Sequence, residues 1–324
     1  MSEAAAQSRD VRGRDTRGLG ARLWDYQAER FPVFKHGVLI AAFGASAVCL
    51  SALLRGAAPE WPSLVVAVLV LFGLFFQLRV ADEHKDNEDD TKYRPERPVP
   101  RGLVQLAELR GVAIAVGVIQ IVLTAWLGWA VLALLLLVWV YMAVMTKEFF
   151  APAWLKKRPI VYMVSHMAIM PLIDLYATAC DWLPAGAALH EDFGLTLGAF
   201  LALSLVNGSV IEIARKSWAP GMEREGVETY SKLWGAGRAG FAVMAIVLVG
   251  LALAAFVNVR SGASIWFLVV LMAVTMYAAW TAIDYAGTPT AKAVKRMETG
   301  TALFVIGNYL LLGVLPLMAS LWLA

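Results

Sequence analysis

Nine long apolar runs, separated by charged segments, constrain this chain more than any other feature of its sequence. A helix needs about 20 mostly apolar residues to cross the hydrocarbon core of a bilayer, and each run is close to that length. The composition agrees, because 60% of the residues are hydrophobic and 16% are charged, whereas about 25% are charged in soluble domains. We therefore predict an all-α, polytopic membrane helical bundle with about nine transmembrane helices. The predicted spans are 37–56, 62–80, 111–128, 129–146, 159–179, 193–211, 239–257, 263–283 and 300–323.

The distribution of lysine and arginine indicates how the bundle is oriented. If the N-terminus is cytoplasmic, 26 of the 28 basic residues lie on the cytoplasmic side, and only Arg55 and Arg260 lie outside. Membrane proteins concentrate positive charge in their cytoplasmic loops, so we predict a protein of the cytoplasmic (inner) membrane with its C-terminus outside. Residues 1–22 are polar and predict a flexible cytoplasmic tail, and 23–324 predict a single transmembrane domain surrounded by membrane lipids. The net charge of +3 does not suggest a nucleic-acid partner.

An acidic segment and then a basic one follow the second apolar run directly. The acidic residues are Asp82, Glu83, Asp86 and Asp90. If the helix continues, the three aspartates lie on one face, where their charges repel one another. A divalent cation removes that repulsion, and Mg²⁺ is commonly held by one or two carboxylates together with substrate phosphate oxygens. The segment therefore predicts a metal site, and a solvated loop of mixed charge is the alternative.

Three arginines among prolines complete this segment: Arg94, Arg97 and Arg101. Arginine binds phosphate oxygens bidentately, and the prolines impose an extended path on the chain. We therefore predict that these arginines bind the phosphate groups of a substrate.

This segment resembles the first aspartate-rich motif of the UbiA superfamily of intramembrane prenyltransferases. That motif reads Asn-Asp-x-x-Asp-x-x-x-Asp, followed by Arg-Pro and a Gly. The present chain has Asp82-Glu83-x-x-Asp86-x-x-x-Asp90, followed by Arg97-Pro98 and Gly102. The first two positions differ, but both keep oxygen ligands. The resemblance extends to the nine spans, to the cytoplasmic side on which the motif lies, and to a lysine after the fourth run, Lys147.

The resemblance implies an enzyme that transfers a polyprenyl group from an allylic diphosphate to a small acceptor, which is often aromatic in that family. It implies Mg²⁺ as the cofactor, a polyprenyl diphosphate donor and a small-molecule acceptor as partners. Asp86 and Lys147 are then expected to act in catalysis.

The loop after the sixth run matches the second motif of the family only in part. Its trailing Gly-x-x-Thr and later Gly are present as Gly226, Thr229 and Gly235, but the expected aspartates are replaced by Trp218 and Met222. The nearby residues that we expect to act instead are Glu212 and Glu223 as metal ligands, with Arg215 and Lys216 binding phosphate. A charged loop without a catalytic role is the alternative.

Three of the polar residues inside the predicted spans are further candidates, because such groups are costly there and indicate function by default. His166 and Asp174 are two turns apart in the fifth span, with Pro171 between them, and Asn207 lies near the cytoplasmic end of the sixth. We expect His166 and Asn207 to bind substrate and Asp174 to act in catalysis, by accepting an acceptor hydroxyl or steadying a cationic transition state. A hydrogen bond between helices is the alternative for both His166 and Asp174, and it is favoured for Asp174, which lies only a turn or two from the outer end.

Two other functions agree with this pattern. A transporter is compatible with His166 and Asp174, although transporters usually place polar residues in broken helices near the midplane. A non-catalytic lipid-binding protein of the same fold is the other, because the second motif lacks its aspartates.

Overall fold

The computed structural model of the protein describes residues 15–188 and 190–323. Within them, nine helical segments are long and apolar enough to cross a membrane, which confirms the predicted number. They are Val33–Arg55 (α3), Trp61–Lys85 (α4), Leu106–Leu127 (α6), Trp129–Thr146 (α7), Pro159–Met167 with Ile169–Trp182 (α9 and α10), Glu191–Arg215 (α11), Ala236–Arg260 (α13), Ile265–Gly287 (α14), and Ala291–Leu312 with Val314–Leu323 (α15 and α16).

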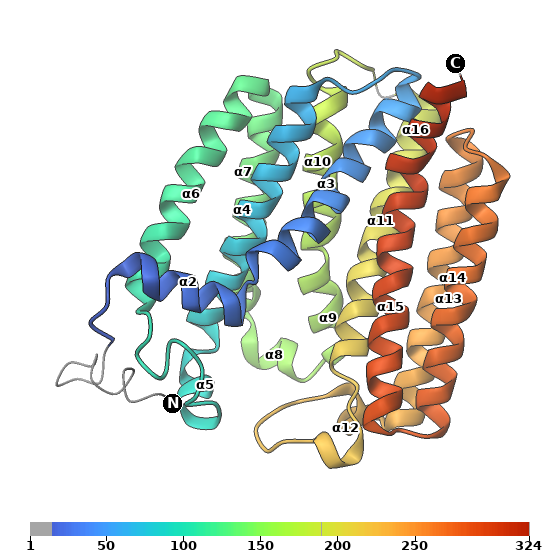
Figure 1. Ribbon diagram of the computed structural model, residues 1–324. Coiled ribbons are helices and arrows are strands. Elements are labelled where there is room, and N and C mark those ends of the chain that lie inside the picture. The colour runs from blue at the N-terminus through green and yellow to red at the C-terminus, as the bar shows by residue number, and fades with distance from the viewer. Residues whose placement is uncertain (1–14, 189, 324) are drawn as a thin grey trace.

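Short helices occupy the connections at one end of this bundle. They are Leu19–Arg30 (α2), Asn87–Tyr93 (α5), Pro152–Lys156 (α8) and Tyr230–Trp234 (α12), with single 3₁₀ turns at Glu148–Phe150 and Pro220–Met222. The spanning helices lie side by side, whereas α2 runs across them (Figure 1). Of the predicted tail 1–22, residues 1–14 lie outside the described residues, and α2 begins at Leu19.

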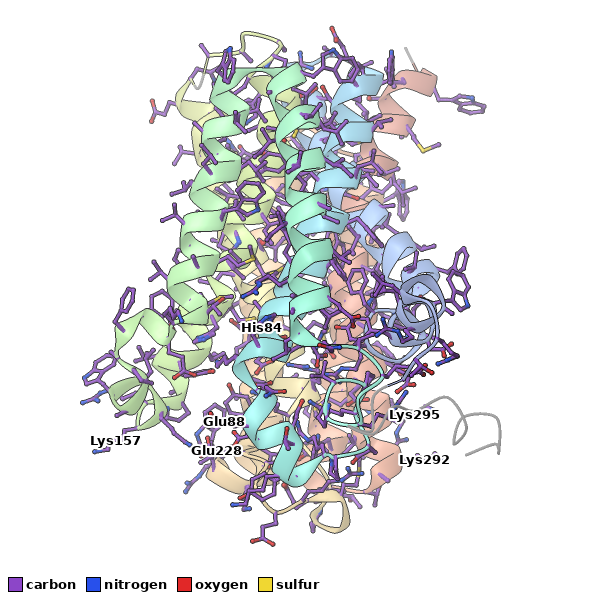
Figure 2. All side chains as sticks on the ribbon, turned by 90° about the vertical axis from the view of Figure 1, so that its left-hand side faces the viewer. His84, Glu88, Lys157, Glu228, Lys292 and Lys295 are labelled. Atoms are coloured by element: carbon purple, nitrogen blue, oxygen red, sulfur yellow. The ribbon has the colours of Figure 1, made fainter. Side chains whose placement is uncertain are left out.

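Charged side chains gather at the end of the bundle where these short helices lie, which we call the charged end. Figure 2 labels six charged or ionisable residues there, all from loops or helix ends: His84, Glu88, Lys157, Glu228, Lys292 and Lys295. Within residues 15–188 and 190–323, the opposite end carries two basic residues, Arg55 at the end of α3 and Arg260 at the end of α13. The chain therefore has the charge asymmetry that the sequence predicts.

The fifth span is broken in the middle. α9 ends at Met167 and α10 begins at Ile169. Pro171 has no N–H to donate, and its ring would clash with the carbonyl four residues earlier, at Met167. The break at Ala168 follows from that proline, and it separates His166 on α9 from Asp174 on α10.

A single residue joins α6 to α7. α6 ends at Leu127, α7 begins at Trp129, and Gly128 between them has a φ of 147°. Large apolar side chains of α6, such as Ile114, Val118 and Val122, are exposed on the bundle surface. In a membrane this helical hairpin therefore faces lipid over much of its surface.

A glycine allows α13 and α14 to pack closely. A Cβ atom at Gly240 would lie 2.6 Å from the carbonyl oxygen of Ala282, which is backbone that cannot move aside easily. Gly237, one turn earlier on α13, has 3.9 Å of room at its nearest contact. The close contact between the two helices therefore requires a glycine at position 240 but not at position 237.

We expect Gly240→Ala to lower the free energy of unfolding by about 1–3 kcal/mol, the usual cost of overpacking. Gly237→Ala should be neutral or stabilising, because alanine is the better helix former by about 1 kcal/mol. Thermal unfolding of both variants in detergent checks this. Equal midpoints for the two would contradict the packing described for Gly240.

Candidate functional site

Side chains from three spanning helices and one turn meet at the charged end. Lys85, the last residue of α4, pairs with Glu148 at 2.9 Å and donates a hydrogen bond to the hydroxyl of Tyr162 on α9. The ring of Tyr162 stacks on that of His166, with 4.0 Å between the centroids. Lys216, at the end of α11, lies within electrostatic range of His166. We call this group, with the neighbouring ends of the three helices, the α4–α9–α11 cluster.

Asp82 and Asp86 bring carboxylates to this cluster from the end of α4. Asp86 is the single residue between α4 and α5. The backbone bonds from Asp86 N to Asp82 O (2.9 Å) and from Asp90 N to Asp86 O (2.8 Å) keep a helical path through the junction. Burial, followed by the neighbouring Asp82 carboxylate, raises the pKa of Asp86. The ionised form of Asp86 is therefore destabilised, and a bound cation would stabilise it.

The end of α11 supplies positive charge opposite these carboxylates. Glu212 is bound at 2.7 Å by both Arg215 and Lys216. Arg215 also lies within electrostatic range of Asp82 on α4. One carboxylate thus fixes two cations in place, and the group keeps a net positive charge facing α4.

Asp90 holds two of the predicted phosphate-binding residues. Its buried carboxylate contacts Arg94 at 3.2 Å and Arg97 at 2.5 Å. Both arginines line a cavity of about 540 Å³ whose other wall is formed by Trp218 and 221–224 of the loop after α11. Because arginine carries five N–H donors, both can bind a further oxyanion in this cavity.

The second loop is braced by its own side chains and by the first loop. Glu223 accepts hydrogen bonds from the hydroxyls of Thr229 (2.8 Å) and Ser231 (2.7 Å). Gly226 has a φ of 73°, and a Cβ there would lie 2.9 Å from the ring of Tyr93. A glycine is thus required where the loop passes over Tyr93, at the end of α5. This contact joins the two motif-bearing loops into one surface.

The turn after α7 has an unusual backbone. Glu148, Phe149 and Phe150 have φ values of 48°, 53° and 57°, in the left-handed region that disfavours side chains other than glycine. Phe149 packs edge-on against Tyr141 and His166, and Glu148 pairs with Lys85. These contacts offset the backbone strain, and strain of this kind is concentrated at functional sites.

Several predicted site residues lie away from the cluster. Asp174 accepts a hydrogen bond of 2.5 Å from the hydroxyl of Tyr309 on α15, and Asn207 accepts one of 2.9 Å from Asn308. The alternative left open for Asp174, a bond between helices, is therefore the contact it makes. Lys147 is exposed, and its neighbour Glu148 faces the cluster instead.

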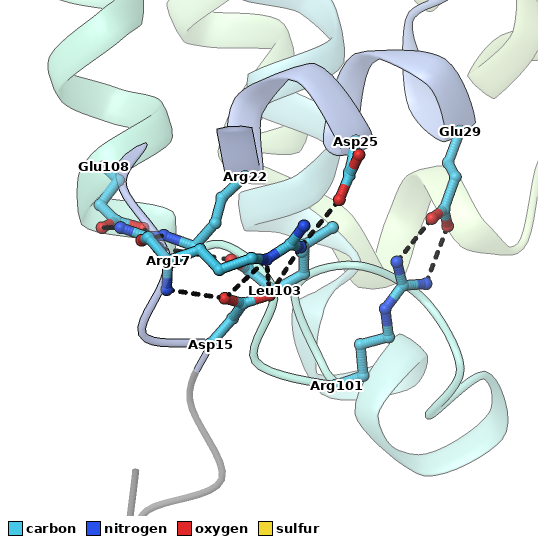
Figure 3. A network of polar contacts seen from close by, with 8 residues as sticks. All are labelled: Asp15, Arg17, Arg22, Asp25, Glu29, Arg101, Leu103 and Glu108. Carbon is cyan, nitrogen blue, oxygen red and sulfur yellow. Dashed lines mark hydrogen bonds and ion pairs between the residues drawn. The ribbon is translucent and has the colours of Figure 1, made fainter. Parts of the chain in front are cut away.

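Two residues of the first motif face the N-terminal helix. Glu83 pairs with Arg30 of α2, and Arg101 pairs with Glu29 of the same helix. Figure 3 shows the second of these pairs, together with the contact between Arg22 and Glu108. Glu83 is thus not beside Asp86, although the two are separated by only two residues.

Sequence reasoning missed three members of the cluster: Lys85, Glu148 and Tyr162. Lys85 offered a signal, since it is a lysine within an acidic run at the end of an apolar helix. Nothing in the local sequence of Glu148 or Tyr162 distinguishes them. Their role arises from distant contacts: Tyr162 bonds to Lys85, 77 residues away, and to Glu148, 14 residues away.

The donor groups at the charged end suit Mg²⁺ shared with a phosphate ligand rather than an all-protein metal site. Among the described residues no three His, Cys, Asp or Glu side chains are grouped to hold a metal ion. Of the six predicted ligands, four are held closely by other side chains: Glu83, Asp90, Glu212 and Glu223. Asp82 makes only a 3.5 Å contact with Arg79 and its side chain is half exposed. Asp82 and Asp86 are therefore the two carboxylates open to a cation, and two carboxylates plus substrate phosphates are a common Mg²⁺ environment.

Comparison with known proteins identifies the fold. No protein-family model and no curated protein sequence matches the chain. The structure of a digeranylgeranylglyceryl phosphate synthase is similar, with a TM-score of 0.62 and 15% identity, covering 90% of this chain and 98% of that one. A UbiA homolog from Archaeoglobus fulgidus gives 0.51 and 12% over 84% and 96% of the two chains, and the same homolog bound to DMAPP and Mg²⁺ gives 0.51 and 13% over 85% and 97%. The protein therefore has the fold of the UbiA superfamily, as the resemblance of its first motif implies.

Proposed function

We propose that the protein is a Mg²⁺-dependent membrane prenyltransferase whose active site is the α4–α9–α11 cluster. One observation carries the proposal, and it concerns one end of a UbiA-fold bundle. There Asp86 lies within electrostatic range of Lys85, and Asp82 lies within range of Arg215, which shares Glu212 with Lys216. Carboxylates for a cation beside cations for an anion match the charge pattern of a metal–diphosphate pair. The related A. fulgidus protein has been described bound to DMAPP and Mg²⁺. From the positive-inside rule we expect this end to face the cytoplasm.

The acidic and basic residues of the cluster have different roles in this proposal. Asp82 and Asp86 hold Mg²⁺, while Lys85, Arg215 and Lys216 bind the diphosphate oxygens of a polyprenyl donor. When bound, Mg²⁺ neutralises the charge that builds up on the diphosphate as the C–O bond breaks. The prenyl chain extends between apolar helices, which exclude water from the allylic carbon while it has cationic character.

Tyr162 and His166 form the wall on which the reacting end of the donor rests. Their rings are stacked, and the ammonium group of Lys85 lies 5.0 Å from the centroid of Tyr162. An aromatic face stabilises a nearby cation, so this wall favours an allylic carbon as positive charge develops. The acceptor attacks that carbon as the C–O bond to the diphosphate breaks. The diphosphate leaves toward Arg94 and Arg97, and it takes up the proton that the acceptor loses.

Loss of phosphate-binding charge at the end of α11 should weaken donor binding. We expect Lys216→Gln to raise the Kd for an allylic diphosphate about tenfold, because a hydrogen bond to a charged group contributes about 1.5–3 kcal/mol. Lys232→Gln removes the same charge from an exposed position on α12 and should change little. Equal effects of the two variants would mean that general electrostatics, and not contact, attracts the donor.

Diphosphate release tests the whole proposal. Purified protein in nanodiscs is incubated with Mg²⁺ and allylic diphosphates of several lengths, with phenols and prenylated glyceryl phosphates as acceptors. Release that depends on both Mg²⁺ and an acceptor supports the enzyme. Donor binding without release would favour the non-catalytic lipid-binding protein. Solute flux in liposomes, without donor binding, would favour a transporter.

A further inference from the structure

The N-terminal helix α2 lies across the charged end, beside the start of α6 and the end of α4 (Figure 1). Arg22 makes a bidentate pair with Glu108 on α6, at 2.7 and 2.8 Å. Arg101, in the loop between α5 and α6, makes a second bidentate pair with Glu29, at 2.5 and 2.8 Å (Figure 3). Bidentate arginine–carboxylate pairs fix orientation as well as distance. One side of α2 is therefore attached both to α6 and to the loop that carries the arginines of the first motif.

The same side of α2 also reaches the first motif itself. Arg30 pairs at 2.6 Å with Glu83, whose side chain is only 1% exposed, and the buried hydroxyl of Tyr26 lies 3.5 Å from the same carboxylate. Glu83 adjoins Asp82 in the chain, so its position sets where that carboxylate points. A buried carboxylate without its partner is costly, so the pair specifies one placement of this end of α4.

The loop of residues 94–104 is consequently held from two directions. On its inner side, Asp90 binds Arg94 and Arg97. On its outer side, α2 binds Arg101 and packs Tyr26 against Leu103 and Val104. Without α2 this loop would keep the inner attachment and one backbone hydrogen bond, from Asp15 N to Gly102 O at 3.0 Å.

The other side of α2 is apolar and exposed. Trp24 is 60% exposed, and at 3.6 residues per turn it lies opposite the side that carries Arg22, Tyr26 and Glu29. Ala21 and Ala28 share its face and are also exposed. α3 begins two residues after α2 ends, and its first turns expose Phe34 and Val38, which belong to the surface of a spanning helix. The exposed face of α2 thus continues a lipid-facing surface.

We propose that α2 is an interfacial strap, which lies in the lipid headgroup region with Trp24 inserted and holds the first motif in register through Arg30–Glu83 and Arg101–Glu29. Its partner is the headgroup–acyl boundary of the leaflet at the charged end. Tryptophan is enriched at that depth, and a helix with one apolar and one charged side lies in the interface plane. Arg30 and Glu83 are positioning residues in this scheme. Only its effect on the donor rests on the proposed function.

Membrane contact is tested by labelling one position at a time. Cys49 and Cys180 are both buried, so a cysteine introduced as Trp24→Cys is the accessible one to label with an environment-sensitive fluorophore. In phosphatidylcholine–phosphatidylglycerol nanodiscs we expect quenching by lipids carrying a doxyl group and protection from iodide. Lys92→Cys, exposed on α5, is the control and should show the reverse. Iodide quenching at position 24 equal to that at position 92 would overturn the interfacial placement.

The attachment of the loop is tested separately. We expect Arg30→Gln and Glu29→Gln each to speed hydrogen exchange in 94–104 at least tenfold and to raise the donor Kd, with partial rescue by Arg30→Lys. Arg17→Gln is the control: among the described residues its side chain pairs with Asp15 and Asp25, and the substitution leaves the backbone bond from Asp15 N to Gly102 O in place. Glu29 is partly exposed, so its variant folds even if loss of the buried pair destabilises Arg30→Gln.

Exchange in 94–104 that stays at the wild-type rate in both variants would overturn the strap. If wild-type protein fails to bind any allylic diphosphate, the proposed function falls, but quenching and hydrogen exchange still decide the role of α2.

Discussion

Asp86→Ala should lower Mg²⁺-dependent diphosphate release by roughly 10²–10³-fold, the usual loss when one group that stabilises developing charge is removed. Asp86 is half-buried at the junction of α4 and α5, close enough to Asp82, Lys85 and Arg97 to feel their charges. No ion pair among the described residues uses its carboxylate. The variant should therefore fold normally and lose activity alone, which steady-state release and a thermal unfolding scan measure together.

The matched control is Asp89→Ala. Asp89 belongs to the same acidic run and has the same charge, but its side chain is exposed. It should keep nearly full activity. Comparable losses in the two variants would show that the acidic run acts through its total charge, and the assignment of Asp86 to the metal would fail.

Arg55→Ala should lower the free energy of unfolding by about 3–5 kcal/mol, because it leaves a buried charge without its partner. Arg55 lies at the end of the bundle opposite the cluster and binds Asp181 with two hydrogen bonds, at 2.7 and 2.9 Å. The Asp181 side chain is 1% exposed and also accepts a hydrogen bond from Ser51. Unfolding in detergent micelles, followed by circular dichroism, measures the change.

Arg260 provides the comparison at the same end of the bundle. It pairs with Asp192, whose side chain is 75% exposed. Exposed pairs contribute about 0–1 kcal/mol, so Arg260→Ala should be almost neutral. Both variants remove an arginine from the last position of a spanning helix. A similar loss of unfolding free energy in the two would refute the argument from burial.

The spans could be predicted from sequence because they depend on local composition. Each needs only enough consecutive apolar residues, and the break in the fifth span follows from Pro171 alone. The boundaries were less predictable. α4 continues to Lys85 and α15 begins at Ala291, since helical hydrogen bonding extends past the apolar run into polar sequence.

The partners of the acidic residues could not be predicted, because they come from distant parts of the chain. Glu83 and Asp86 are both acidic residues of the motif, yet Glu83 forms an ion pair with an arginine 53 residues earlier. Asp174 meets a tyrosine 135 residues later. Glu148 enters the cluster in place of Lys147 because the backbone turns left-handed at residues without glycine, and no sequence rule anticipates that.

The one-residue link at Gly128 has a consequence for how the protein is made. α6 and α7 are too closely joined to enter the membrane independently, so during synthesis they must insert or fail as a pair. A failure removes two crossings, an even number, and leaves every later helix facing the same way. The orientation of the helices after α7 is therefore the same whether or not this lipid-exposed hairpin inserts.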